Sequence, residues 1–209
     1  MKRFVAMLWV ALLATASISA QAPQGWKVRM DRSTDAADPD AVGNIKFTAS
    51  GSKFHFMNPQ AGVYWNPANT ASGNFTLKGT FKLIKSTGYD EYYGLIFGGN
   101  GLDAASQSYL YFMVTDDGTY LVKRRTGIST EEVAPKASSP AVKKPDGSGT
   151  ATNALEVRVK ADKVDFVVNG TVVTSLPRAG LGGKPDGIYG IRINHHLEVE
   201  VDGFGVTKM

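Results

Sequence analysis

The sequence predicts an all-β protein in which the strands form a two-sheet antiparallel jelly-roll sandwich. Nearly every apolar segment after Gly25 is short and alternates apolar with polar residues, which is typical of half-buried strands. Outside the first 20 residues, no window keeps the roughly 3.6-residue apolar period of an amphipathic helix. Turn residues interrupt these segments at spacings of roughly 8–12 residues, and this spacing favours a sandwich.

The first 20 residues are predicted to be a secretory signal peptide. Lys2 and Arg3 precede an apolar run from Phe4 to Leu13, and small residues follow up to Ala20. The apolar run is about half of the ~20 residues that a membrane-spanning helix needs, so we expect cleavage after Ala20 and no membrane span. A short buried N-terminal segment is the alternative. With cleavage, the protein is expected to be secreted or periplasmic.

Composition and charge favour one globular domain over residues 21–209. The chain has 209 residues, of which 43% are hydrophobic and 20% are charged. Loss of Lys2 and Arg3 with the signal peptide lowers the formal charge from +4 to +2, and no block of basic residues stands out. No nucleic-acid partner is therefore expected. The absence of cysteine excludes disulfides, thiolate metal sites and cysteine nucleophiles.

Strands are expected wherever an alternating segment lies between turn residues. Asn169-Gly170, between two apolar triplets, is a strong hairpin signal because both central positions of such a turn need a positive φ. The predicted strands cover residues 26–30, 45–49, 53–58, 62–66, 74–84, 92–98, 108–114, 119–125, 154–160, 164–168, 172–176, 188–194 and 197–201, with 204–207 continuing the last.

Three segments are predicted to be loops. Residues 31–43 are polar and contain four aspartates. Residues 135–152 are rich in Pro, Ser, Gly and Lys, and so long a segment is expected to be a functional or mobile loop. Residues 98–101 are rich in glycine but lack the lysine and helix of a phosphate-binding loop, so a flexible loop is expected there.

Residues 108–125 are expected to form a hairpin whose two faces can be assigned. A three-residue loop with Gly118 in the left-handed position pairs Phe112 with Val122. A two-residue turn would instead place Tyr111 beside Val122. The first pairing gives one apolar core face of Leu110, Phe112, Val114, Tyr120 and Val122, and an opposite face of Tyr109, Tyr111, Leu121, Lys123 and Arg125.

A series of strand patterns runs in a fixed order through residues 75–207. The patterns are YGLIF at 93–97, SYLYFMV at 108–114, DGTYLVKR at 117–124, NALEVRV at 153–159, VDFVVNG at 164–170, GIYGI at 187–191 and VEVDGFGV at 199–206. This order resembles the concanavalin A-like lectin/glucanase sandwiches of the laminin-G-like type and the bacterial 3-keto-disaccharide hydrolase type. The resemblance implies two packed antiparallel sheets, one of which often binds glycans. Such relatives include lectins, glycoside hydrolases and modules without known activity, so the fold alone does not fix the function.

The resemblance and the hairpin together suggest a secreted module that binds carbohydrate or another extracellular ligand without catalysis. Tyr109, Tyr111, Lys123 and Arg125 are the expected ligand-binding residues, because a tyrosine ring can stack on a sugar while its hydroxyl stays in water. The two cations would favour an acidic glycan. The alternative at this face is a covering loop under which the tyrosines only pack. A structural or adhesive module without a glycan site is a further alternative function.

Glu198, Glu200 and Asp202 carry the alternative in which the protein is an enzyme. They occupy alternate positions of one strand and so share a face. A glycoside hydrolase or 3-keto-disaccharide hydrolase-type enzyme could use Glu198 and Glu200, since glycoside hydrolysis needs two carboxyl groups with one held protonated. We expect instead a solvated face whose charges pair with basic residues such as Arg192 and Arg158 across the strands. No catalytic residue is favoured.

The sequence requires no cofactor and suggests only a structural calcium ion. The resemblance implies that some relatives hold calcium with an aspartate of the closing strand, which corresponds to Asp202 here. The aspartates of residues 31–40 could add the oxygen ligands that calcium prefers. His195 and His196 are predicted to lie in a solvated tight turn between two strands. Neighbouring side chains of a strand point to opposite sides, so the two histidines are not expected to share a metal. With His55 they make up the three histidines of the chain, and their spacing matches no metal motif.

Overall fold

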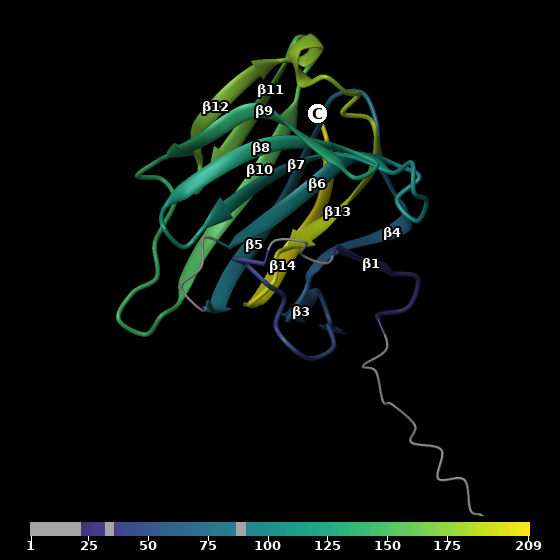
Figure 1. The fold of residues 1–209 in the computed structure, drawn as a ribbon. Coiled ribbons are helices and arrows are strands. Elements are labelled where there is room, and N and C mark those ends of the chain that lie inside the picture. The colour runs from purple at the N-terminus through teal and green to yellow at the C-terminus, as the bar shows by residue number, and fades with distance from the viewer. Residues whose placement is uncertain (1–21, 32–35, 87–90) are drawn as a thin grey trace, which may run out of the picture.

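Two antiparallel sheets of seven strands each are stacked face to face in the computed structural model, which describes residues 22–31, 36–86 and 91–209. Sheet A has the strand order β1-β4-β13-β6-β7-β8-β9, and sheet B has the order β12-β11-β10-β5-β14-β3-β2. In Figure 1, β6, β7 and β8 of sheet A lie over β5 and β10 of sheet B. The predicted all-β jelly-roll sandwich is confirmed. The predicted signal peptide, residues 1–20, lies outside the described residues.

The strands span most of the described chain. Their bounds are β1 Lys27–Asp31, β2 Lys46–Ser50, β3 Lys53–Asn58, β4 Ala61–Ala71, β5 Phe75–Lys85, β6 Tyr92–Asn100, β7 Ser108–Thr115, β8 Thr119–Thr126, β9 Ser129–Ser138, β10 Ala151–Val159, β11 Lys163–Val168, β12 Thr171–Pro177, β13 Gly187–Ile193 and β14 Leu197–Lys208. One short 3-10 turn, η1 (Arg178–Leu181), follows β12. No helix among the described residues is long and apolar enough to cross a membrane.

The main hydrophobic core lies between the two sheets. On β5, the alternation buries every second residue from Phe75 to Leu83 and exposes Lys78 and Lys82 on the outer face of sheet B. On β10, Leu155, Val157 and Val159 follow the same period of two. The alternation read from the sequence is therefore the pattern by which each strand places one face against the other sheet.

Both hairpin predictions are confirmed. Asn169 and Gly170 have φ values of 50° and 82°, as a turn with two left-handed positions requires. Phe112 pairs with Val122 across β7 and β8, and Gly118 has a φ of 87°. The five residues predicted for the core face of this hairpin all lie in the main core, so the opposite face, with Tyr109 and Tyr111, points away from sheet B.

The structure corrects the predicted loops in three places. Strand β9 was not predicted, because its sequence STEEVAPKAS is polar and interrupted by proline; as an edge strand of sheet A, it buries only Ala134 fully. Residues 135–138, predicted as loop, belong to β9, and residues 151–152 begin β10. In the segment between these two strands, the backbone N–H of Lys143 donates a hydrogen bond of 2.8 Å to Oδ1 of Asn153. Nδ2 of Asn153 donates a hydrogen bond of 3.0 Å to the carbonyl oxygen of Lys143.

The glycine-rich segment 98–101 is also more ordered than predicted. Residues 98–100 end β6, and the pairing of β6 with β7 shifts there in a β-bulge. Gly98 has a φ of 61°, and a Cβ at this position would lie 2.2 Å from the carbonyl oxygen of Lys184. Glycine therefore permits a close backbone approach here rather than a flexible loop.

Candidate functional site

The outer face of sheet A carries a second apolar cluster, which is separate from the core between the sheets. It includes Tyr109, Tyr111 and Met113, the outward-facing residues of β7. Leu102, from the connection between β6 and β7, packs onto the same cluster. The buried members of this outer-face cluster are Val63, Trp65, Ile96, Leu102, Tyr109, Tyr111, Met113 and Leu121.

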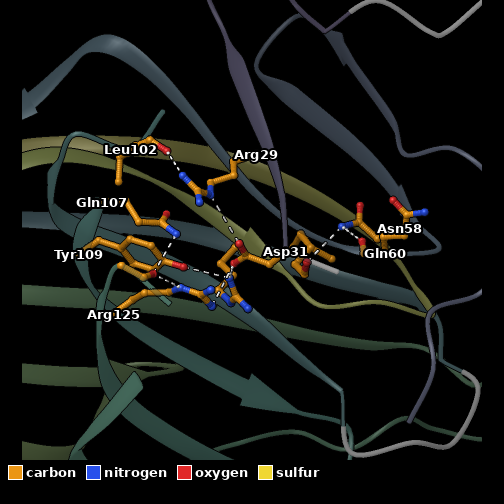
Figure 2. A network of polar contacts seen from close by, with 11 residues as sticks. Arg29, Asp31, Asn58, Gln60, Leu102, Gln107, Tyr109 and Arg125 are labelled. Atoms are coloured by element: carbon orange, nitrogen blue, oxygen red, sulfur yellow. Dashed lines mark hydrogen bonds and ion pairs between the residues drawn. The ribbon is translucent and has the colours of Figure 1, made fainter. Parts of the chain in front are cut away.

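A network of arginines surrounds one carboxylate at the edge of this cluster. Asp31, at the end of β1, forms an ion pair with Arg192 of β13 and lies 3.4 Å from Nη1 of Arg125. Nε of Arg29 lies 3.7 Å from the other oxygen of Asp31. Figure 2 shows Asp31 between Arg29 and Arg125, with Tyr109 beside it. The Asp31–arginine network therefore joins strands β1, β13 and β8 across the sheet.

Arg192 connects the network to both tyrosines. Its Nη1 donates a hydrogen bond of 2.9 Å to the Tyr109 hydroxyl, and its guanidinium lies over the Tyr111 ring, 5.6 Å from the centroid. Tyr109 is 1% exposed and Tyr111 is 6% exposed. Burial raises the pKa of Tyr111 to about 12. Of the two alternatives for this face, rings open for stacking or packed tyrosines, the structure has packed rings, because Arg192 and the outer-face cluster surround them.

A pocket of about 170 Å³ opens beside Tyr111. Gly94 lies in register between Arg192 on β13 and Met113 on β7. A Cβ at Gly94 would lie 2.2 Å from the carbonyl oxygen of Phe112, so glycine allows β6 and β7 to approach closely in this row. The pocket is lined by Tyr92, Tyr111, Met113, Leu121, Lys123, Arg192 and Asn194.

Positive charge exceeds negative charge on this face. Lys123 pairs in register with Tyr111 on one side and with Glu132 of β9 on the other. Together with the three arginines, Lys123 makes four cations against the carboxylates of Asp31 and Glu132. A ligand bound on this face would therefore meet two cationic groups, the partly exposed Lys123 and the guanidinium of Arg192. Of the four predicted binding residues, Tyr111 and Lys123 line the pocket, whereas Tyr109 and Arg125 belong to the network beside it.

A second polar cluster lies where the segment after residue 35 meets the β13–β14 turn. His195 is 5% exposed, and its Nε2 lies 2.9 Å from Glu91 and 3.1 Å from Asp38. Its Nδ1 lies 3.2 Å from Asp40. Burial first, and then the charge of Asp38, raises the pKa of Glu91 to about 8. This histidine–carboxylate cluster adjoins the pocket in sequence, since Tyr92 follows Glu91 and Asn194 precedes His195.

The two adjacent histidines lie closer together than the sequence analysis predicted. His196 has a φ of 60°, a left-handed conformation that turns the chain between β13 and β14. The two imidazole centroids are 4.7 Å apart. The predicted turn between the two strands is confirmed, but His195 is 5% exposed and so is buried rather than solvated.

The three carboxylates of β14 share the outer face of sheet B, as predicted. Glu198 lies 2.9 Å from Nε2 of His55, and Asp202 accepts a hydrogen bond of 2.9 Å from the Ser52 hydroxyl. This face lies on the opposite side of the sandwich from Tyr111. Of the aspartates of segment 31–40, Asp31 contacts Arg192, and Asp38 and Asp40 contact His195. Catalysis by Glu198 and Glu200 and calcium at Asp202 remain predictions.

Sequence reasoning did not identify Arg192 or Glu91 as parts of a site, and it considered Asp31 only as a ligand of calcium. Arg192 is the one charged residue in the apolar strand β13, GIYGIRI, and this interruption is the signal that could have drawn attention to it. Asp31 and Glu91 lie outside any recognisable motif, and the sheet topology alone brings them to their partners.

Comparison with known proteins supports the fold and assigns no family. No family model and no curated protein matches the sequence. Among solved structures, the carbohydrate binding module CBM66 from Bacillus subtilis has a TM-score of 0.61 at 10% identity, over 88% of this chain and 96% of that chain. A Bacillus subtilis protein of unknown function with a galectin-like fold also has a TM-score of 0.61, at 14% identity, over 88% of this chain and 89% of that chain.

Glucan-degrading enzymes share the fold as well. A GH16 protein of a Bacteroides ovatus mixed linkage glucan PUL, solved in complex with a product, has a TM-score of 0.55 at 10% identity, over 88% of this chain and 94% of that chain. The chain therefore has the concanavalin A-like jelly-roll fold. Because one architecture includes both binding modules and hydrolases, the choice between them depends on the site.

Proposed function

We propose that this protein binds carbohydrate at the outer face of sheet A, with one sugar residue in the pocket between Tyr111 and Lys123, and that it does so without catalysis. The observation that carries this proposal is the composition of the pocket. Two tyrosines and two other apolar side chains line it together with a lysine, an arginine and an asparagine. Polar groups that converge beside apolar and aromatic side chains are what fix the orientation of a ligand in a small-molecule site.

The size of the pocket favours part of a glycan rather than a whole small molecule. Its volume of about 170 Å³ is below the roughly 300–1,000 Å³ of pockets that enclose drug-sized ligands. A single sugar residue would fill it, and the rest of the chain would run over the neighbouring strands. Solved structures with the same fold include a carbohydrate binding module, which supports a glycan as the ligand class.

The charge of the site supports an acidic sugar. Arg192 and Lys123 both line the pocket, and charge-assisted hydrogen bonds from such groups to a carboxylate are stronger than neutral ones. Because Arg192 covers the Tyr111 ring, recognition relies on polar contacts from these cations. Tyr92, which is half-buried, also lines the pocket, and Nζ of Lys136 lies over its ring, 5.6 Å from the centroid.

The positions of the carboxylates of β14 support binding without turnover at this pocket. Glu198 and Glu200, the carboxylates of the hydrolase alternative, lie on the other sheet. They are therefore too far around the sandwich to act on a sugar held by Tyr111 and Lys123. An enzyme using them would need a separate site on sheet B.

A screen of polysaccharides and keto-disaccharides tests this function. Uronate polymers such as polygalacturonate and neutral glucans such as laminarin would each be titrated into the protein by calorimetry, while chromatography follows their depletion. The expected result is saturable binding of a uronate-containing glycan with no loss of polymer. Turnover of a bound glycan, or the absence of saturable binding across the panel, would contradict the proposal.

A further inference from the structure

The histidine–carboxylate cluster at the β13–β14 turn has the geometry of a metal site. One ligand atom each from Asp38, His195 and His196 can be chosen so that all lie within 4.8 Å of one another. In a tetrahedral site with bonds of about 2.0–2.2 Å, ligand atoms lie roughly 3.5 Å apart, so modest side-chain rotations would close the site. The three residues come from two segments, one before β2 and one between β13 and β14.

Two buried groups of this cluster each have one atom without a hydrogen bond among the described residues. Glu91 is 2% exposed and His195 is 5% exposed. Among the described residues, Oε2 of Glu91 and Nδ1 of His195 have no hydrogen-bond partner, although Nδ1 lies 3.2 Å from Asp40. Leaving a buried polar atom without a hydrogen bond costs free energy, so such atoms in a folded protein call for an explanation.

The approach of two carboxylates to one nitrogen points to a cation. Oε1 of Glu91 and Oδ2 of Asp38 lie 2.9 and 3.1 Å from the same Nε2 of His195. A ring nitrogen carries at most one proton, and that proton cannot point directly at both oxygens. A metal ion among these atoms would bind the nitrogen and a carboxylate at the same time.

Each imidazole is oriented as a metal ligand would be. If Nε2 of His195 binds the ion, its Nδ1–H faces the Asp40 carboxylate at 3.2 Å. Nε2 of His196 lies 2.8 Å from the carbonyl oxygen of Pro39, to which it can donate, and this leaves Nδ1 as its ligand atom. Metal-binding histidines regularly donate their second N–H to a carboxylate or a backbone carbonyl, which fixes the ring.

We propose that Asp38, His195 and His196 bind one divalent first-row transition-metal ion such as Zn²⁺, with Asp40 orienting His195. Two imidazole nitrogens and a carboxylate suit zinc and its neighbours, whereas calcium prefers oxygen ligands alone. The ion would tie residues 38–40 to the β13–β14 turn. Because His195 directly follows Asn194, it would also fix one wall of the pocket beside Tyr111.

Titration of Zn²⁺ into the full chain, prepared without a polyhistidine tag and dialysed against a chelator, tests this site. We expect one ion per chain and a higher melting temperature with Zn²⁺. His196→Gln and Asp38→Asn should each weaken Zn²⁺ binding by about tenfold or more. These residues are chosen because His195 is buried, so that its replacement could prevent folding.

His55→Gln is the matched control, because His55 lies on sheet B beside Glu198. This variant should bind Zn²⁺ as the wild type does. Three results would overturn the proposal: no stoichiometric Zn²⁺ binding by the wild type, unchanged affinity in both ligand variants, or a site that takes Ca²⁺ but not Zn²⁺. Circular dichroism of each variant confirms that the compared proteins are folded.

Discussion

Arg192 on β13 donates a hydrogen bond of 2.9 Å to the hydroxyl of Tyr109 on β7, across the intervening strand β6. Both side chains are on the outer face of sheet A, and Asp31 pairs with the same guanidinium. Burying a guanidinium costs free energy unless its charge is paired and its N–H groups are hydrogen-bonded. Here the carboxylate of Asp31 pairs with the charge, and the hydroxyl of Tyr109 accepts a hydrogen bond. This contact fixes the arginine that lines the candidate pocket.

Tyr109→Phe removes the acceptor of that bond and leaves an Arg192 donor unpaired. We expect a loss of about 1–3 kcal/mol in the free energy of unfolding, because hydrogen bonds to charged groups have this magnitude. Chemical denaturation measures the change. Tyr189→Phe serves as the control, since the Tyr189 hydroxyl makes no hydrogen bond to the described residues. Equal stability of both variants would argue against a structural role for the Arg192–Tyr109 bond.

Gly94→Ala should destabilise sheet A beneath the pocket. A Cβ at Gly94 would lie 2.2 Å from the carbonyl oxygen of Phe112, which is backbone and cannot rotate away. Such overpacking costs about 1–3 kcal/mol. Gly147→Ala is the control, because its Cβ would meet nothing within 4 Å. A melting temperature of Gly94→Ala equal to that of the control would show that the strands separate more easily than we infer.

Asp165 gives a pH dependence to stability. It is buried on β11 and accepts hydrogen bonds of 2.6 Å from Lys160 and Ser175, which lower its pKa to about 2. Because the pKa of Asp165 is lower in the folded state than its unfolded-state value of roughly 4, the ionised carboxylate stabilises the fold at any pH above about 4. This stabilisation is lost as the pH falls from about 4 to 2. The contribution is on the order of 1–2 kcal/mol.

Asp165→Asn should therefore be less stable than the wild type at pH 7, and the difference should shrink towards pH 2. Urea denaturation at a series of pH values measures both curves. A difference that stays constant over this range would mean that the charge of Asp165 does not contribute through Lys160 and Ser175.

Tyr111→Ala should weaken glycan binding by opening the pocket wall and releasing Arg192. Removal of a buried ring also lowers stability by about 3–5 kcal/mol, so binding is measured only under conditions where the variant is folded. Tyr111→Phe keeps the packing and separates the hydroxyl from the ring. Unchanged glycan affinity in folded Tyr111→Ala would exclude this surface as the binding site.

The fold could be predicted because its determinants are local. Strand β7 is apolar on both faces, so the three-residue turn with Gly118 set the register that assigned both faces of that hairpin. Strand β9 could not be predicted in the same way. As an edge strand it pairs only with β8, so its polar sequence does not alternate. Its place in the sheet is set by backbone pairing with β8 and not by an apolar pattern in its own sequence.

The site could be predicted only in part because its contacts are long-range. Tyr111 and Lys123 were found from a single hairpin. Arg192 and Asp31 reach the same surface only through the order β1-β4-β13-β6, which no local pattern contains. The turn at His195 and His196 was predicted from the sequence, but the left-handed φ of His196 is a property of the folded turn that no local pattern contains.

Titration of an acidic polysaccharide into Lys123→Ala, beside the wild type and Lys82→Ala, tests the carbohydrate site most directly. Lys123 lines the pocket, whereas Lys82 is exposed on the outer face of sheet B. We predict that Lys123→Ala binds about tenfold or more weakly, since losing one charge-assisted hydrogen bond costs about 1.5–3 kcal/mol. Lys82→Ala should bind as the wild type does. Equal affinities in all three proteins, or a loss in Lys82→Ala alone, would contradict binding at the outer face of sheet A.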